Sequence, residues 1–88
     1  MGIRQATLVP YDVRRANERS RTALNRFLFG RTEVRPSKRY RYPGLVEEGA
    51  EWVGQSVFLL DPPLADRLIV KLQELRIRYR ARTVYVEM

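Results

Sequence analysis

The sequence predicts a single α+β domain spanning residues 1–88. Three observations carry this prediction. Segments with the alternating or β-branched composition of strands are interleaved with two segments in which apolar residues recur at spacings of three and four, the period of a helix. No internal repeat and no low-complexity linker divides the chain. Apolar residues make up 44% of the sequence, which is too many for a disordered basic tail.

The first strand is expected over residues 4–11, where alternate positions share one face. Pro10 cannot donate to a ladder, so this strand should end there or lie at a sheet edge. Asp12 is the expected N-cap of a helix from about residue 13 to residue 29, and Gly30 is the expected residue that closes it. The predicted buried stripe of this helix consists of Val13, Ala16, Ser20, Leu24, Phe27 and Leu28.

The middle of the chain predicts two further strands. Residues 31–37 are expected to be a loop, and a strand follows at residues 38–42, where charged and aromatic residues alternate. Pro43-Gly44 is a turn signal. Residues 45–51 form a connection with a local acidic patch, and a strand lies within residues 52–60, most clearly at its end.

Asp61 followed by two prolines predicts the start of a second helix, with Asp61 as N-cap and Pro62 at the first helical position. The helix should end near Leu75. Its predicted apolar stripe is Leu64, Leu68, Leu72 and Leu75, with Ile69 beside it. Residues 78–87 are rich in β-branched and aromatic residues and predict the last strand.

The resulting order, β-α-β-β-α-β, predicts a ferredoxin-like fold with four antiparallel strands and two helices on one face. The alternative is a winged helix in which residues 38–60 form the wing. That fold needs a third helix, for which the sequence has no convincing segment.

The charge of the chain is unevenly distributed. Residues 1–44 carry eleven basic and three acidic residues, a net of +8, whereas residues 45–88 carry six and seven, a net of −1. Such a dense positive field attracts polyanions, of which nucleic acid is the most abundant in a cell. Binding of this kind weakens with salt because counterions are released. The competing interpretation is a solvated Arg-rich surface.

Two surfaces are candidates for the contact. One is the basic helix, which needs no base pocket to hold a phosphate backbone. The other is a sheet platform in which the alternating arginines of residues 38–42 and 76–82 share one sheet and tyrosines stack on bases. The competing interpretation makes these tyrosines core residues. The predicted nucleic-acid contacts are Arg14, Arg15, Arg19, Arg26, Lys38, Arg39, Arg41, Arg78, Arg80 and Arg82.

Enzymatic chemistry has few candidates here. The chain has no His and no Cys, which removes the commonest general base, the commonest metal ligand and any disulfide. No glycine-rich phosphate loop occurs. Asp12 is the best-placed carboxylate, but one carboxylate is a poor cation site and helix capping is the favoured role. The acidic group Glu47, Glu48 and Glu51 is interpreted as a solvated loop. We therefore expect no cofactor, no metal and, on balance, no catalysis.

Three segments carry a resemblance to a known family: Leu8-Val9-Pro10-Tyr11-Asp12-Val13, Trp52-Val53-Gly54-Gln55-Ser56-Val57-Phe58 and Thr83-Val84-Tyr85-Val86. They resemble the small CRISPR-associated adaptation proteins of ferredoxin-like fold. That resemblance implies a homodimer that bridges DNA and, at Asp12, metal-dependent nuclease activity. The His-free, Arg-rich composition and the Tyr-x-Tyr-Pro-Gly-Leu segment (residues 40–45) are also similar to small uncharacterised basic proteins of thermophilic archaea.

Three functional hypotheses follow. The favoured one is a non-enzymatic module that binds RNA or duplex DNA through the backbone, alone or within a larger nucleoprotein assembly. The second is the adaptation-type dimer. The third is an adaptor whose basic helix faces an acidic protein partner. No apolar run is long enough to span a membrane, and we expect a soluble, cytoplasmic protein.

Overall fold

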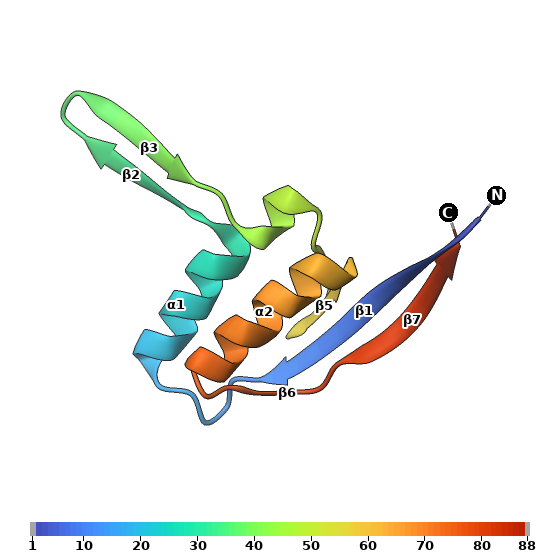
Figure 1. Cartoon of the computed structure of the whole chain (residues 1–88). Coiled ribbons are helices and arrows are strands. Elements are labelled where there is room, and N and C mark those ends of the chain that lie inside the picture. The colour runs from blue at the N-terminus through green and yellow to red at the C-terminus, as the bar shows by residue number, and fades with distance from the viewer. Residues whose placement is uncertain (1, 88) are drawn as a thin grey trace.

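The structure is a computed structural model that describes residues 2–87. It is a mixed α+β arrangement of an antiparallel sheet and two α-helices, as the sequence predicts (Figure 1). The elements in chain order are β1 (Ile3–Asp12), α1 (Glu18–Phe29), β2 (Arg31–Arg35), β3 (Lys38–Tyr42), the 3-10 helix η1 (Leu45–Glu48), β4 (Glu51–Gly54), β5 (Val57–Leu60), α2 (Pro62–Glu74), β6 (Arg78–Tyr79) and β7 (Arg82–Glu87).

The main sheet has the order β4-β5-β1, with β6 and β7 both on the far side of β1. Every pairing in it is antiparallel. Tyr11 lies opposite Tyr79 and Leu8 lies opposite Arg82, so one register runs through β6 and β7 without a shift. The two labels therefore describe one edge strand that is interrupted at residues 80–81.

Pro10 explains the interruption. The backbone N–H of Arg80 donates to the Pro10 carbonyl oxygen at 2.9 Å, but proline has no N–H to return the second bond of that pair. Our expectation that the first strand ends at Pro10 or lies at an edge is wrong. The strand continues to Asp12 and is central, because β5 pairs with it on the other side, with Pro10 opposite Val57.

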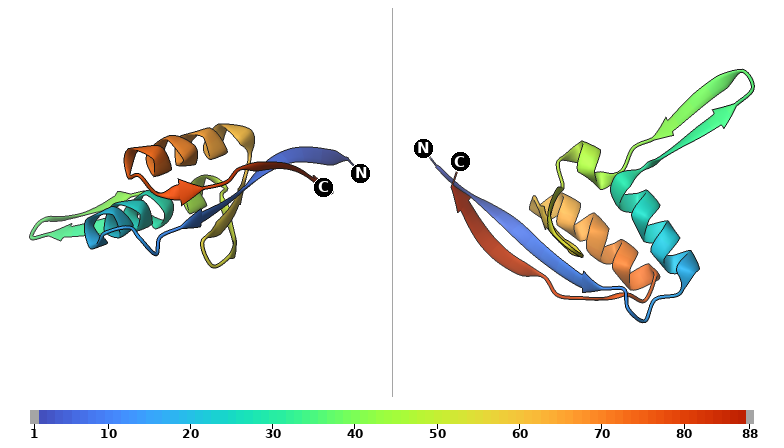
Figure 2. Two further views of the ribbon diagram at one scale, coloured as in Figure 1. Left: turned by 90° about the horizontal axis from the view of Figure 1, so that it is seen from below. Right: turned by 180° about the vertical axis from the view of Figure 1, so that it is seen from behind.

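The termini extend the molecule at one end. The first residues of β1, Ile3 to Ala6, pair only with β7, because pairing with β5 begins at Thr7. They form a two-stranded arm whose chain ends lie side by side (Figures 1 and 2). The molecule measures 49 × 34 × 20 Å along its principal axes, with this arm and the β2–β3 hairpin at opposite ends.

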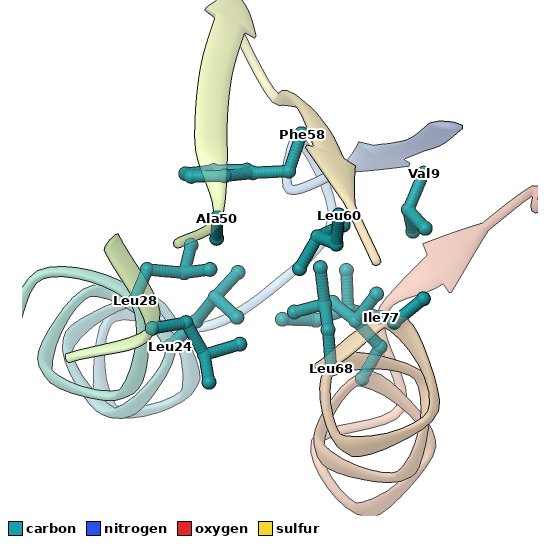
Figure 3. Packing of buried hydrophobic residues seen from close by; sticks show 11 residues of the cluster. Val9, Leu24, Leu28, Ala50, Phe58, Leu60, Leu68 and Ile77 are labelled. Carbon is teal, nitrogen blue, oxygen red and sulfur yellow. The ribbon is translucent and has the colours of Figure 1, made fainter. Parts of the chain in front are cut away.

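One apolar cluster joins the helices to the sheet. Leu24 and Leu28 of α1 and Leu68 of α2 point toward Phe58 and Leu60 of β5 (Figure 3). The predicted stripes are thus confirmed at their centres, where Leu24, Leu28, Leu68 and Leu72 are fully buried. The other apolar stripe residues are partly buried. Those that pack against the cluster are Val13, Ala16, Phe27, Leu64 and Leu75, and Ile69 is partly buried but is not among them.

The start of the first helix differs from our prediction. Asp12 is not the N-cap; α1 begins at Glu18, and the Asn17 side-chain oxygen accepts the Ser20 backbone N–H at 2.8 Å. Asp12 is instead the last residue of β1, opposite Arg78, so residues 13–17 are needed to turn the chain before a helix can begin. Gly30 closes α1 as expected, at φ +77°.

The second helix agrees more closely with the sequence. Asp61 is the N-cap residue, Pro62 begins the helix and Glu74 ends it. The Asp61 carboxylate makes no capping hydrogen bond, because it is paired with Arg4 of β1. Within residues 2–87 no further α-helix occurs, so the third helix of the winged-helix alternative is missing.

Residues 31–42 are the largest departure. We expected a loop followed by a strand of the main sheet, but both halves form strands that pair only with each other, as the hairpin β2–β3. Figure 1 shows this hairpin projecting from the body. Gly30 and Gly44 meet at its base, where a Cβ on Gly44 would lie 2.3 Å from the Gly30 nitrogen.

Candidate nucleic-acid interface

The β2–β3 hairpin is a solvated basic and aromatic projection. All of its residues from 31 to 42 are exposed except Glu33, which is partly buried. The pairing of Arg31 with Tyr42 and of Arg35 with Lys38 places two sets of side chains on opposite faces. One face carries Arg31, Glu33, Arg35, Lys38, Tyr40 and Tyr42, and the other carries Thr32, Val34, Arg39 and Arg41.

Cation–π contacts order the first of these faces. The guanidinium carbon of Arg31 lies 4.7 Å from the centroid of the Tyr42 ring, and that of Arg35 lies 5.2 Å from Tyr40. Glu33 pairs with both arginines, at 3.3 and 3.4 Å. Tyr40 and Tyr42 remain 38% and 41% exposed. Glu33 engages only the Nη2 atom of each stacked guanidinium, so the other N–H groups can still donate and this face presents donors and π surfaces together.

The predicted residues of β3 divide into two groups. Arg41 lies at the hairpin base, where its guanidinium pairs with Glu47 and donates to the Phe29 carbonyl oxygen at 3.0 Å. It therefore ties β3 to η1 and to the end of α1, and its charge is balanced. Lys38 and Arg39 lie near the tip, and within residues 2–87 neither side chain has an ion-pair or hydrogen-bond partner.

The arginines in and before α1 also divide. Arg19 and Arg26 are exposed and seven residues apart, so they share one helix face. Arg15 is exposed in the preceding turn. The Arg21 guanidinium donates to the backbone carbonyl oxygens of residues 13 and 14, at 3.0 and 3.3 Å. These bonds hold the turn that precedes α1 against the helix.

The predicted sheet platform is wrong. Arg39 and Arg41 belong to the hairpin. In contrast, Arg78, Arg80 and Arg82 lie on the edge strand of the main sheet. The two strands share an alternating pattern, but no strand of the main sheet pairs with β3 among the described residues. A local alternation predicts which face a side chain takes and does not specify the neighbouring strand.

Asp12 is held by its neighbours. Arg14 Nε and Nη2 donate to the two carboxylate oxygens, and the charge of Arg78 adds to the effect. These contacts hold the pKa of the Asp12 carboxyl well below its usual range. The residues from 2 to 87 contain no group of three or more carboxylates, histidines or cysteines that could hold a metal ion.

Two carboxylates of the acidic group have partners elsewhere in the fold, whereas Glu51 is exposed at the start of β4. Glu47 pairs with Arg41 of the hairpin, and the Glu48 carboxylate accepts a hydrogen bond from Arg67 of α2 at 2.8 Å. That contact lowers the pKa of Glu48. These carboxylates therefore secure the hairpin base and η1 against the helices.

The structure brings three predicted residues together in a basic pocket. Arg14 and Arg15 line it from the turn after β1, and Arg78 lines it from β6, around a cavity of about 360 Å³. Arg76 belongs to the arginine alternation of residues 76–82 but was not among the predicted contacts, and it lines the same cavity beside Asp12, Ala16 and Ile77. The signal for it was the alternation of arginines at positions 76–82, although Arg76 itself lies outside the strand.

Most of the basic side chains form no ion pair with a carboxylate in the part of the chain that the structure describes. The ion pairs within residues 2–87 engage seven of the seventeen basic residues, which leaves ten.

No helix in residues 2–87 is long and apolar enough to cross a membrane. Comparison of the chain with protein-family models, with curated proteins and with solved structures finds no match.

Proposed function

We propose that this protein is a non-enzymatic module that binds RNA or duplex DNA, chiefly through phosphates. One observation carries the proposal: the β2–β3 hairpin is a projecting basic and aromatic element that contributes no residue to the core. Ordering a twelve-residue segment has an entropic cost of about 1–2 kcal/mol per residue. A hairpin without buried side chains recovers little of that cost from packing, which favours a role in contacting a partner.

The chemistry of the hairpin fits nucleic acid. Arg35, Lys38 and Arg39 near its tip supply charge-assisted donors for phosphates. Tyr40 and Tyr42 supply ring faces on which bases can stack, and such stacking is sequence-tolerant. A two-stranded ribbon also has the dimensions that a duplex groove admits. The arginines on α1 lengthen the same positive surface toward the body.

The body itself we assign to the ferredoxin-like arrangement. With the hairpin set aside, the elements follow the order β1, α1, β4, β5, α2 and β6/β7, which is the β-α-β-β-α-β order of that fold. On this assignment the hairpin is an insertion between the first helix and the second strand. A sheet body with a projecting ribbon suits a subunit of a larger nucleoprotein assembly.

The experiment is a salt series with two charge-matched variants. The wild-type protein should show a linear fall of log affinity with log salt on RNA or duplex DNA. Lys38→Gln with Arg39→Gln should lower that slope by up to about two units. Arg67→Gln with Lys71→Gln removes the same charge from α2, outside the proposed surface, and should leave the slope close to wild type.

Two outcomes would replace the proposal. Preferential binding of an acidic polypeptide over nucleic acid across the same series would favour the adaptor hypothesis. Magnesium- or manganese-dependent cleavage of DNA that disappears in Asp12→Asn, with folding unchanged, would favour the adaptation-type nuclease. Equal salt slopes for the two double variants would show that the hairpin tip is not the contact surface.

A further inference from the structure

The basic pocket between the turn after β1 and the turn after α2 concentrates charge from two distant parts of the chain. Arg14 and Arg15 come from the first turn, and Arg76 and Arg78 from the second. Asp12 is the one carboxylate in the lining, so the lining residues carry a net charge of +3. A cavity of about 360 Å³ lies at the small end of the range that holds small ligands.

The pocket does not neutralise this charge internally. Both oxygens of Asp12 are engaged by the Arg14 guanidinium, and the Arg14 backbone N–H also donates to one of them at 2.9 Å. Within residues 2–87 the side chains of Arg15, Arg76 and Arg78 form no ion pair, although the charge of Arg78 acts on Asp12. Like charges that line one cavity repel one another, and an anion in the cavity removes that repulsion.

Arg76 occupies a backbone position that favours glycine. The N–H of Ile77 donates to the Leu72 carbonyl oxygen and the N–H of Arg76 to that of Gln73, at 2.9 and 3.1 Å. These two bonds form a Schellman motif, in which the residue at the position of Arg76 takes a left-handed conformation, here at φ 56°. A side chain at positive φ strains the backbone. Within residues 2–87 the Arg76 guanidinium forms no hydrogen bond and no ion pair, so its donors remain available to a ligand in the cavity.

The ligand that suits this pocket is a phosphate at the end of a chain. A terminal phosphate carries about −1.5 to −2 charges at neutral pH and three strong acceptor oxygens, whereas an internal phosphodiester carries one charge. Arginine forks bind such oxygens in pairs. From the pocket, α1 leads to the hairpin over about 18 Å, the length of its twelve residues. Arg19 and Arg26 lie along that path.

We propose that this pocket, lined by Arg14, Arg15, Arg76 and Arg78, binds the terminal phosphate of a nucleic-acid strand whose body follows α1 toward the hairpin. This inference rests on the proposed function and adds an end preference to it. The pocket anchors the strand end, and the hairpin holds internal phosphates and bases.

The test compares strands that differ only at their ends. A short RNA and a DNA duplex are each prepared with a 5′-phosphate, with a 3′-phosphate and with hydroxyl ends, and binding is measured at one salt concentration. The wild-type protein should bind a phosphorylated form about tenfold more tightly than the hydroxyl form. Arg76→Gly should abolish that difference, because binding of the phosphorylated form falls to about the level of the hydroxyl form.

Controls separate the pocket from folding and from the hairpin. Arg76→Gly should not lower the melting temperature, because glycine accepts the left-handed conformation. Arg15→Gln, in the other turn, should reduce the same preference. The Lys38→Gln and Arg39→Gln variant should weaken binding of all end forms by the same factor.

The outcomes distinguish the two proposals. Equal binding of all end forms by the wild-type protein, with a steep salt dependence, would overturn the pocket inference and leave the proposed function standing. An end preference that survives in both Arg76→Gly and Arg15→Gln would also overturn it. No binding of any form would overturn the proposed function itself.

Discussion

Arg14 holds the carboxylate of Asp12 from two directions. Its Nη2 lies 2.7 Å from one carboxylate oxygen, and its Nε and backbone N–H lie 3.0 and 2.9 Å from the other. The contact spans only two residues, and it forms where β1 ends opposite Arg78. The Asp12 carboxylate therefore accepts hydrogen bonds from Arg14 and so holds the turn that follows β1.

The low pKa of Asp12 predicts a specific pH dependence. Because the folded state holds this pKa below its unfolded value of about 3.9, ionised Asp12 favours folding above that value, and the contribution is lost as the pH falls through the folded pKa. Asp12→Asn should therefore have a lower free energy of unfolding than wild type at neutral pH. This difference between the two proteins, the stability gap, should become smaller in acid. Chemical denaturation at neutral pH and at about pH 2.5 measures both gaps. A gap that does not change with pH would contradict the assignment.

Asn17, and not Asp12, should control the start of α1. Asn17→Ala removes the oxygen that accepts the Ser20 N–H, and should lower the free energy of unfolding by about 0.5–2 kcal/mol. Asn17→Asp should restore most of it, because Asp caps about as well. Denaturation curves give the stability, and amide hydrogen exchange reports the Ser20 N–H directly. Unchanged protection of Ser20 in Asn17→Ala would show that the cap contributes nothing.

The base of the hairpin depends on two glycines that touch. At Gly44, with φ −100°, alanine has no backbone penalty, but its Cβ would lie 2.4 Å from the Leu28 carbonyl oxygen and closer still to Gly30. Gly44→Ala should therefore lower the free energy of unfolding by about 1–3 kcal/mol through overpacking alone. A thermal or denaturant melt measures this loss.

Gly54→Ala is the matched control, because its Cβ would approach no atom closer than 3.9 Å. Its effect should stay within about 0.5 kcal/mol of wild type. If the two alanine variants proved equally stable, the hairpin base would be looser than the structure describes. A shift in nucleic-acid affinity for Gly44→Ala alone would link the hairpin orientation to binding.

Pro10 and residues 31–42 show where sequence reasoning fails. The rule that proline avoids central strands follows from its missing backbone N–H donor. The first strand nevertheless stays central, because it pairs in one continuous register with β6 and β7 on one side and with β5 on the other. Arg31–Arg35 has the polar composition of a loop, and nothing local reveals that it pairs with β3. The strand with which a segment pairs can be distant in the sequence. The alternation of side chains along a strand is the same whichever strand is its partner, so it does not identify that partner.

The sequence by itself determined the features that depend on neighbouring residues. These are the mixed α+β class, the limits of α2 from its Asp-Pro start, the closure of α1 at Gly30 and the buried leucines of both helices. Helix periodicity and turn chemistry act over a few residues, so they can be read without a partner.

Only the tertiary structure decided which distant segments meet. It separated β3 from the main sheet, and it moved the cap of α1 from Asp12 to Asn17 because Asp12 is needed opposite Arg78. It also joined Arg14 and Arg15 with Arg76 and Arg78 around one cavity. The physical reason is that pairing and packing between distant segments set these positions, and neither is encoded in local spacing.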